Sequence, residues 1–141
     1  MSGEYEDKFA GERLLLAFMY AHPGKKLNFM GYEIGQFKEW DYCAGIDLFL
    51  AEKFELHAKM REFVKYLNGI YKTNPAFFKN DFAWDGFEWL VLDDKYNNFF
   101  AFSRYGGKQS VTALMNFSGV DIKNYKVGIN KGKYRTILNT E

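Results

Sequence analysis

A group of polar side chains follows a short apolar run in the first third of the chain. The run 27–30 is followed by Gly31, and the residues after it include two carboxylates, one amide and one indole: Glu33, Gln36, Glu39 and Trp40. Carboxylates can transfer protons or accept hydrogen bonds from hydroxyl groups, and an indole ring can stack on a flat apolar face. Because loops that follow buried strands build the active sites of α/β barrels, this order predicts a substrate-binding loop.

Two other interpretations of this loop stay open. Glu33 and Glu39 can be solvated loop carboxylates, and Trp40 can be a lid over the core, since polar loops after strands are the rule. The spacing does not favour Glu33 and Glu39 as a catalytic acid–base pair, so we predict substrate contacts and no catalytic residue. The single cysteine, Cys43, cannot hold a metal alone, and we expect no metal site and no cofactor.

Composition narrows the class of protein. The 141 residues are 48% apolar and 20% aromatic, which is enough for a packed core, and the net charge of +1 offers no basic face for nucleic acid. An aromatic excess also suits the binding of sugars. The chain has no long apolar run for a membrane, and its first residues are acidic and polar, unlike a secretory signal. We therefore expect a cytoplasmic protein that binds neither nucleic acid nor membrane.

The apolar pattern in the first half of the chain predicts a helix, a strand, a loop and a second helix, in that order. Apolar residues at helical spacing indicate helices over about 7–20 and 56–71. The first is ended by His22-Pro23-Gly24 and the second by Asn74-Pro75, because proline disfavours helix in the residue before it. Between them, 27–30 is expected to be a buried parallel-type strand.

After Pro75 the apolar pattern changes to a period of two. Short alternating runs separated by turn residues predict an antiparallel sheet or sandwich, with strands at 87–92, 99–104, 110–117, 125–129 and 134–138. Alternation places Trp89 on one face with Phe87 and Val91, so Trp84 and Trp89 are expected to belong to the β region's structure rather than to a ligand site. The composition shift at 76–83 is the predicted domain boundary.

One strand between two helices cannot bury its own faces. Its hydrogen-bonding edges would stay unpaired, and the helical stripes Leu14, Phe18 and Leu56, Met60, Phe63, Leu67 would face water. We therefore expect homo-oligomers whose contacts lie within residues 7–74. The alternative is repacking inside the chain, with the strand joining the β region and the helices folding over it.

Many short motifs, in order and spacing, resemble bacterial glycogen branching enzymes, the 1,4-alpha-glucan branching enzymes of the alpha-amylase superfamily. Those motifs are His22-Pro23-Gly24-Lys25-Lys26-Leu27-Asn28-Phe29-Met30-Gly31, Glu33, Gly35-Gln36, Glu39-Trp40, Leu67-Asn68, Ile70-Tyr71, Pro75-Ala76, Asp81-Phe82, Gly86-Phe87-Glu88-Trp89, Asp93-Asp94, Asn116-Phe117, Tyr125, Gly128-Ile129, Gly132 and Ile137-Leu138-Asn139-Thr140. The chain departs from the family pattern at Lys38, where arginine is common, and at Asp47-Leu48, where Asp-Trp is common.

The resemblance implies an α+β fragment that is incomplete at both ends. Residues 1–76 would be the seventh helix, eighth strand and eighth helix of a (β/α)8 barrel, and residues 77–141 a truncated antiparallel C-terminal β domain. In the family, an α-1,4-glucan chain is cut and transferred to a 6-hydroxyl through a covalent glycosyl-enzyme. The family's catalytic Asp, Glu and His-Asp segments have no counterpart in this sequence, so the resemblance implies a glucan partner but no activity for the isolated chain. The alternative is a non-catalytic module for glucan binding or self-association.

Overall fold

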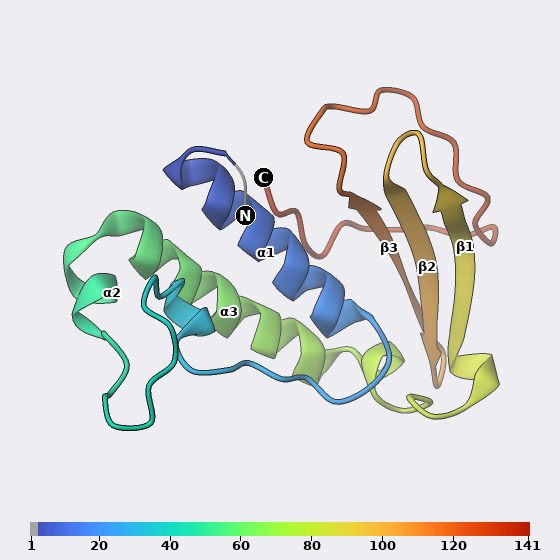
Figure 1. Cartoon of the computed structure of the whole chain (residues 1–141). Coiled ribbons are helices and arrows are strands. Elements are labelled where there is room, and N and C mark those ends of the chain that lie inside the picture. The colour runs from blue at the N-terminus through green and yellow to red at the C-terminus, as the bar shows by residue number, and fades with distance from the viewer. Residues whose placement is uncertain (1–2) are drawn as a thin grey trace.

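The computed structural model describes residues 3–141 and places the helices beside a small sheet (Figure 1). The long helices are α1 (Tyr5–Ala21) and α3 (Glu55–Thr73), preceded by the short α2 (Phe49–Lys53). The strands are β1 (Phe87–Asp94), β2 (Phe99–Gly106) and β3 (Gln109–Asn116), and single 3₁₀ turns occur at Tyr32–Ile34, Pro75–Phe77 and Trp84–Gly86. None of the helices within residues 3–141 is long and apolar enough to cross a bilayer.

Both predicted long helices are confirmed, and local signals explain their ends. At the start of α1, Glu4 and Asp7 form a reciprocal capping box. Helix α1 ends at Ala21 and α3 at Thr73, and their C-cap residues, His22 and Asn74, directly precede prolines, as the restriction on residues before proline requires.

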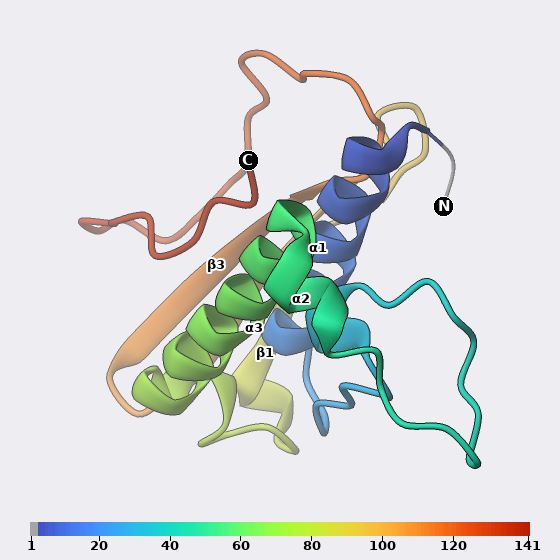
Figure 2. The ribbon, with the colours of Figure 1, turned by 90° about the vertical axis from the view of Figure 1, so that its left-hand side faces the viewer.

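Helix α1 lies between α3 and the sheet and contributes to two apolar cores (Figures 1 and 2). One core joins α1 and α3 through Phe9, Leu16, Tyr20, Met60, Val64 and Leu67. The other joins α1 to the sheet through Ala21, Phe77, Phe102, Ala113 and Met115, with Leu14 and Phe18 packed against it. The expectation that the two helical stripes face water is therefore wrong, because the helices bury them against each other and against the sheet.

The sheet has the order β1-β2-β3 and is antiparallel throughout. Three of the five predicted strands are thereby confirmed, as is the antiparallel β region of the predicted fold class. Trp89 packs against Phe87 and Phe102 but is 36% exposed, so it lies at the rim of the core. The Trp84 ring is fully exposed.

The predicted strand 27–30 does not form, and the structure shows none of the barrel strands that would be its neighbours. Residues 25–29 form neither helix nor strand, and they pair with no strand within the described part of the chain. Apolar residues alone do not make a strand, because its backbone N–H and C=O groups need a ladder partner. The conformation of this segment depends on what lies next to it.

The predicted strands 125–129 and 134–138 are also absent, because their side chains are held elsewhere. Tyr125 stacks on Phe99 with ring centroids 4.2 Å apart. Further along, Ile137 and Leu138 pack onto the two cores, and side chains of the helices bind the backbone carbonyls. The Tyr66 hydroxyl donates to the Ile137 carbonyl and Arg13 Nε donates to the Thr140 carbonyl, at 2.9 Å each. These contacts replace a strand ladder.

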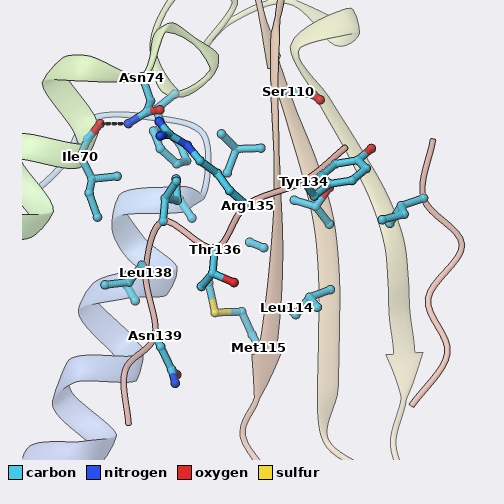
Figure 3. A pocket seen from close by; sticks show the side chains of 18 of the residues that line it. Ile70, Asn74, Ser110, Leu114, Met115, Tyr134, Arg135, Thr136, Leu138 and Asn139 are labelled. Atoms are coloured by element: carbon cyan, nitrogen blue, oxygen red, sulfur yellow. Dashed lines mark hydrogen bonds between the residues drawn. The ribbon is translucent and has the colours of Figure 1, made fainter. Parts of the chain in front are cut away.

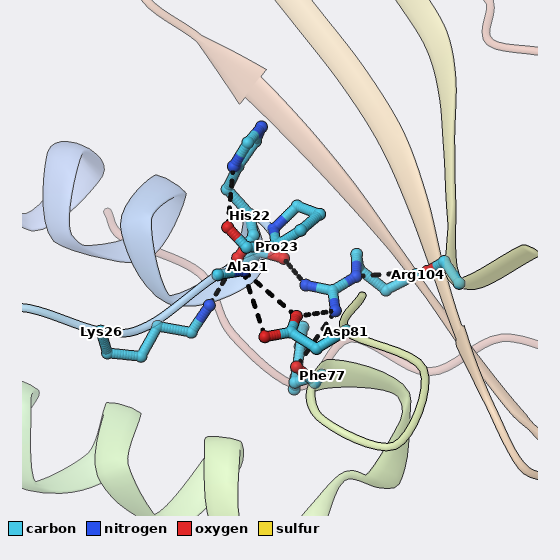
Figure 4. A network of polar contacts seen from close by, with 9 residues as sticks. Ala21, His22, Pro23, Lys26, Phe77, Asp81 and Arg104 are labelled. Atoms are coloured by element: carbon cyan, nitrogen blue, oxygen red, sulfur yellow. Dashed lines mark hydrogen bonds and ion pairs between the residues drawn. The ribbon is translucent and has the colours of Figure 1, made fainter. Parts of the chain in front are cut away.

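A buried arginine connects the end of α1, the loop before β1 and strand β2 (Figure 4). Arg104 Nη2 lies 2.7 Å from Asp81 Oδ1, and the guanidinium also donates to the carbonyls of Ala21, Phe77 and Gly86. Asp81 in turn accepts from the Gly24 amide. Every hydrogen-bonding group of this junction therefore has a partner, as buried charges require.

Candidate functional site

The loop predicted from the sequence as a binding site is held against the two long helices. Its 3₁₀ turn at Tyr32–Ile34 lies between Gly31 and Gly35, both in the left-handed region with φ of 91° and 62°. A Cβ at Gly35 would lie 2.7 Å from the ring of Phe9 in α1. Glycine is therefore required there, both for the backbone conformation and for the close contact with α1.

Gln36 holds the loop together rather than projecting from it. Its side-chain oxygen accepts from the Asp47 amide at 2.8 Å, and its side-chain nitrogen donates to the Lys38 carbonyl at 3.1 Å. The Gln36 backbone amide donates to the Gly31 carbonyl. Both polar atoms of the Gln36 side chain thus have partners within residues 38–47.

Three exposed aromatic rings follow one another on the outer side of the loop. The ring centroids of Phe29 and Trp40 are 5.8 Å apart, and those of Trp40 and Tyr42 are 6.4 Å apart. Trp40 is 53% exposed and Tyr42 is 84% exposed. We call Phe29, Trp40 and Tyr42 the aromatic strip. Such a strip offers flat apolar faces with a hydroxyl and an indole N–H at their edges, which suits the faces of sugar rings.

The structure brings together three of the four predicted contact residues. Gln36, Glu39 and Trp40 line one small cavity of about 10 Å³, and Glu33 is not among its lining residues. A volume of this size holds about one water molecule, so the loop forms a wall rather than an enclosed sugar site. Because Glu33 and Glu39 do not converge on this cavity, the arrangement gives no support to a catalytic carboxylate pair.

His57, which no sequence motif singled out, holds the back of the loop. The ring is fully buried; Nδ1 lies 2.6 Å from the Ile34 carbonyl oxygen and Nε2 lies 2.8 Å from the Tyr5 hydroxyl. A buried polar side chain with two partners fixes the elements that supply those partners. The available signal was a histidine on the otherwise apolar face of the second helix.

Two half-buried ionisable groups have displaced pKa values near this region. Burial raises the pKa of the Glu12 carboxyl from 4.5 to about 7, and one of its oxygens would lie 3.2 Å from a Cβ at Gly35. Burial lowers the pKa of the Lys26 ammonium from 10.5 to about 8, although the neighbouring Asp81 carboxylate opposes the change. In both cases loss of hydration disfavours the charged form.

A larger cleft of about 810 Å³ lies between β3, the two long helices and the segment 125–140 (Figure 3). Its walls carry both apolar side chains, such as Leu114 and Met115, and polar ones, such as Asn74, Arg135 and Asn139. The cleft exists because 134–138 runs beside β3 without pairing with it. Within residues 3–141 no group of three or more His, Cys, Asp or Glu side chains is placed to hold a metal ion.

Comparison with known proteins identifies the class of the β region first. The model of the alpha amylase C-terminal all-beta domain matches residues 89–141, which include most of β1, all of β2 and β3, and the segment that follows. The sheet thus resembles the domain that follows the catalytic barrel in proteins of the alpha-amylase superfamily.

The whole chain is also similar to a particular enzyme of that superfamily, the 1,4-alpha-glucan branching enzyme GlgB. It is 42% identical to the protein from Aquifex aeolicus, 41% to that from Rhizobium meliloti and 42% to that from Corynebacterium diphtheriae, with all of this chain covered each time. It spans only 23%, 19% and 20% of the length of those relatives. The resemblance inferred from the sequence is confirmed, and the chain corresponds to the carboxyl-terminal part of these enzymes.

Proposed function

We propose that this chain supplies the carboxyl-terminal part of a 1,4-alpha-glucan branching enzyme, and that its loop 31–42 forms one wall of the glucan-binding cleft. The observation that carries this proposal is the exposed aromatic strip on a loop that is fixed from behind by α1 and α3. Sugar-binding residues need a rigid support and an open face, and this loop has both.

In this proposal the loop binds and orients glucan and performs no bond cleavage. Trp40 and Tyr42 would stack on glucose units, and Glu39 would accept hydrogen bonds from sugar hydroxyls. Glu33 remains a weaker candidate because it lies apart from the Glu39 cavity, and Gln36 would act mainly by shaping the loop. Retaining glycosyl transfer needs two carboxyl groups about 5 Å apart on either side of the bond, and this loop does not supply them.

We retain the predicted division of the chain: residues 1–76 would complete a barrel, and residues 77–141 would form the β domain. Segment 27–30 would become a strand only when neighbouring strands of a longer protein lie beside it. The exposed apolar residues of 27–54 support this, since a segment with unpaired backbone groups offers them for pairing with a strand that lies beside it.

Binding is tested by titrating maltoheptaose into the ¹⁵N-labelled chain. We expect weak binding that shifts the Trp40 indole signal and its neighbours, because only one wall of the cleft is present. The variant Trp40→Ala should lose most of this response, and Trp84→Ala, which removes an equally large exposed ring from the β region, should keep it. Shifts confined to the β region or to the cleft beside β3 would place the sugar elsewhere.

Activity is tested separately with the iodine-staining assay on amylose. We expect the isolated chain to leave the stain unchanged, because a binding wall cannot replace the covalent nucleophile. Turnover that disappears in Glu33→Gln would contradict the proposal and make this loop catalytic.

A further inference from the structure

The strongest unexplained feature outside the loop is the buried contact of His57 with the loop's backbone. His57 lies in α3, Tyr5 lies at the start of α1, and Ile34 lies in the 3₁₀ turn of the loop. The imidazole therefore connects three separate elements through its two nitrogens, at 2.6 Å to the Ile34 carbonyl and 2.8 Å to the Tyr5 hydroxyl.

The partners determine which nitrogen of the neutral ring carries the proton. A carbonyl oxygen can only accept, so Nδ1 must donate to Ile34, and Nε2 then accepts from the Tyr5 hydroxyl, which can donate. The Ile34 carbonyl thus selects the tautomer with the proton on Nδ1, and the Tyr5 hydroxyl supplies the hydrogen bond that the second nitrogen needs.

The imidazole and its hydrogen bond to the Ile34 carbonyl are buried among aromatic rings. The rings of Phe9, Phe37 and Phe54 lie 5.0, 5.1 and 6.0 Å from the imidazole, each near edge-on. A hydrogen bond in such an apolar cage is stronger than one in water, and losing either partner leaves a buried polar group unsatisfied.

We propose that His57 is a positioning residue for glucan binding, and that it acts through the Ile34 carbonyl while the Tyr5 hydroxyl satisfies its second nitrogen. This inference rests on the proposed function of loop 31–42. The contact fixes the turn that directly precedes Gly35 and Gln36, and Gln36 in turn holds Lys38 and Asp47. The orientation of Trp40 and Tyr42 therefore depends on a side chain that never contacts the sugar.

The chain provides a matched pair of variants for the test. Tyr5 and Tyr20 both lie in α1, and each donates or shares a hydroxyl hydrogen bond with α3, Tyr5 with His57 and Tyr20 with Asn68. Tyr5→Phe and Tyr20→Phe each remove one oxygen atom and keep the ring. Only Tyr5→Phe leaves the buried Nε2 of His57 without a hydrogen-bond partner. A general loosening of the helix pair would therefore appear in both variants, and a loss of positioning in Tyr5→Phe alone.

We expect ¹⁵N spectra of the wild-type ring to show a proton on Nδ1 and an unprotonated, hydrogen-bonded Nε2, and Tyr5→Phe to shift the Nε2 signal. Hydrogen exchange of the loop amides of Ile34, Gly35 and Gln36 should become about threefold to tenfold faster in Tyr5→Phe, as expected for one lost hydrogen bond. In Tyr20→Phe the exchange rates should stay as in the wild type. Equal effects in both variants, or a proton on Nε2 in the wild type, would overturn the inference.

The sugar titration separates this inference from the proposed function. If maltoheptaose shifts Trp40 in the wild type, Tyr5→Phe should weaken that response at least threefold while Tyr20→Phe keeps it, and an unchanged response in Tyr5→Phe would refute positioning. If maltoheptaose shifts nothing in the wild type, the proposed glucan wall fails. The exchange rates and ring signals then still decide whether His57 controls the loop.

Discussion

The helix–sheet body, which consists of α1, α3 and strands β1 to β3, buries its apolar side chains differently from the segment 25–54. In the body, α1 lies between α3 and the sheet, and each apolar face meets another within the chain. In the segment, large side chains such as Leu27, Phe37 and Tyr42 are mostly exposed. Both regions are rich in apolar residues, so the difference teaches that apolar content alone does not bury a side chain, and that a packed element beside it does.

The largest expected loss of stability follows the removal of the buried Arg104 charge, which connects the elements of the helix–sheet body. Arg104→Met should lower the free energy of unfolding by about 3–5 kcal/mol, because it leaves the Asp81 carboxylate without its ion-pair partner. Removing the charge of Lys65, whose ion pair with Glu62 is exposed, should cost less than about 1 kcal/mol. Urea denaturation monitored by circular dichroism measures both.

A double variant tests whether the unpaired Asp81 charge causes this loss of stability. Arg104→Met combined with Asp81→Asn should be less destabilised than Arg104→Met alone, because no unpaired charge remains while the Gly24 amide keeps an acceptor. A single Arg104→Met that costs no more than the exposed Lys65 variant would show that the junction does not stabilise the body.

The next largest effect is the pH dependence of the free energy of unfolding that Glu12 and Lys26 produce. The pKa of Glu12 is about 7 when folded, so between pH 4.5 and 7 the unfolded chain has released a proton that the folded chain keeps, and stability falls as pH rises. The pKa of Lys26 is about 8 when folded, so above pH 8 the unfolded chain keeps a proton that the folded chain has released, and stability rises.

These opposite slopes predict minimum stability between about pH 7 and 8. Glu12→Gln should abolish the fall on the acidic side, and Lys26→Met should abolish the rise on the basic side, measured by urea denaturation at pH 5, 7.5 and 9.5. A wild-type curve with its maximum near pH 7.5 would mean that other groups dominate and that neither side chain is buried as described.

The contrast between the helix–sheet body and the segment 25–54 also explains how much of the fold the sequence could predict. Helices α1 and α3 and strands β1 to β3 follow from local periodicity and from turn residues such as Pro23 and Pro75, and all five were predicted. The segments 27–30, 125–129 and 134–138 have equally apolar or alternating patterns but form no strand. Strand pairing is a property of two segments, and the pattern of one segment does not show whether its partner is present.

Part of the candidate site could likewise be predicted from the sequence, and part could not. The sequence predicted the loop and the three residues Gln36, Glu39 and Trp40 that meet there, because an apolar run followed by glycine and polar residues is a local signal. It could not predict the support of the loop, since the partners of His57 lie 52 and 23 residues away along the chain. Such contacts exist only once the helices have packed.

The smallest expected effect on stability, and the sharpest test of the comparison, concerns the exposed surface of the segment. Tyr42→Ser should change the free energy of unfolding by less than about 0.5 kcal/mol, because surface substitutions rarely do more. It should nevertheless reduce self-association, which we expect of the wild-type chain through the exposed side chains of 27–54. Burying a few hundred Å² of apolar surface gains several kcal/mol at about 25 cal/mol per Å², before the cost of association.

The β region offers the matched control for this last prediction. Tyr96→Ser removes an exposed tyrosine from the turn between β1 and β2, which lies outside the segment 25–54. Light scattering over a concentration series should show weaker association for Tyr42→Ser and wild-type association for Tyr96→Ser. A wild-type chain that stays monomeric at high concentration would mean that segment 25–54 remains soluble without a partner. In that case its exposed rings would be available to glucan and not to a second copy of the chain.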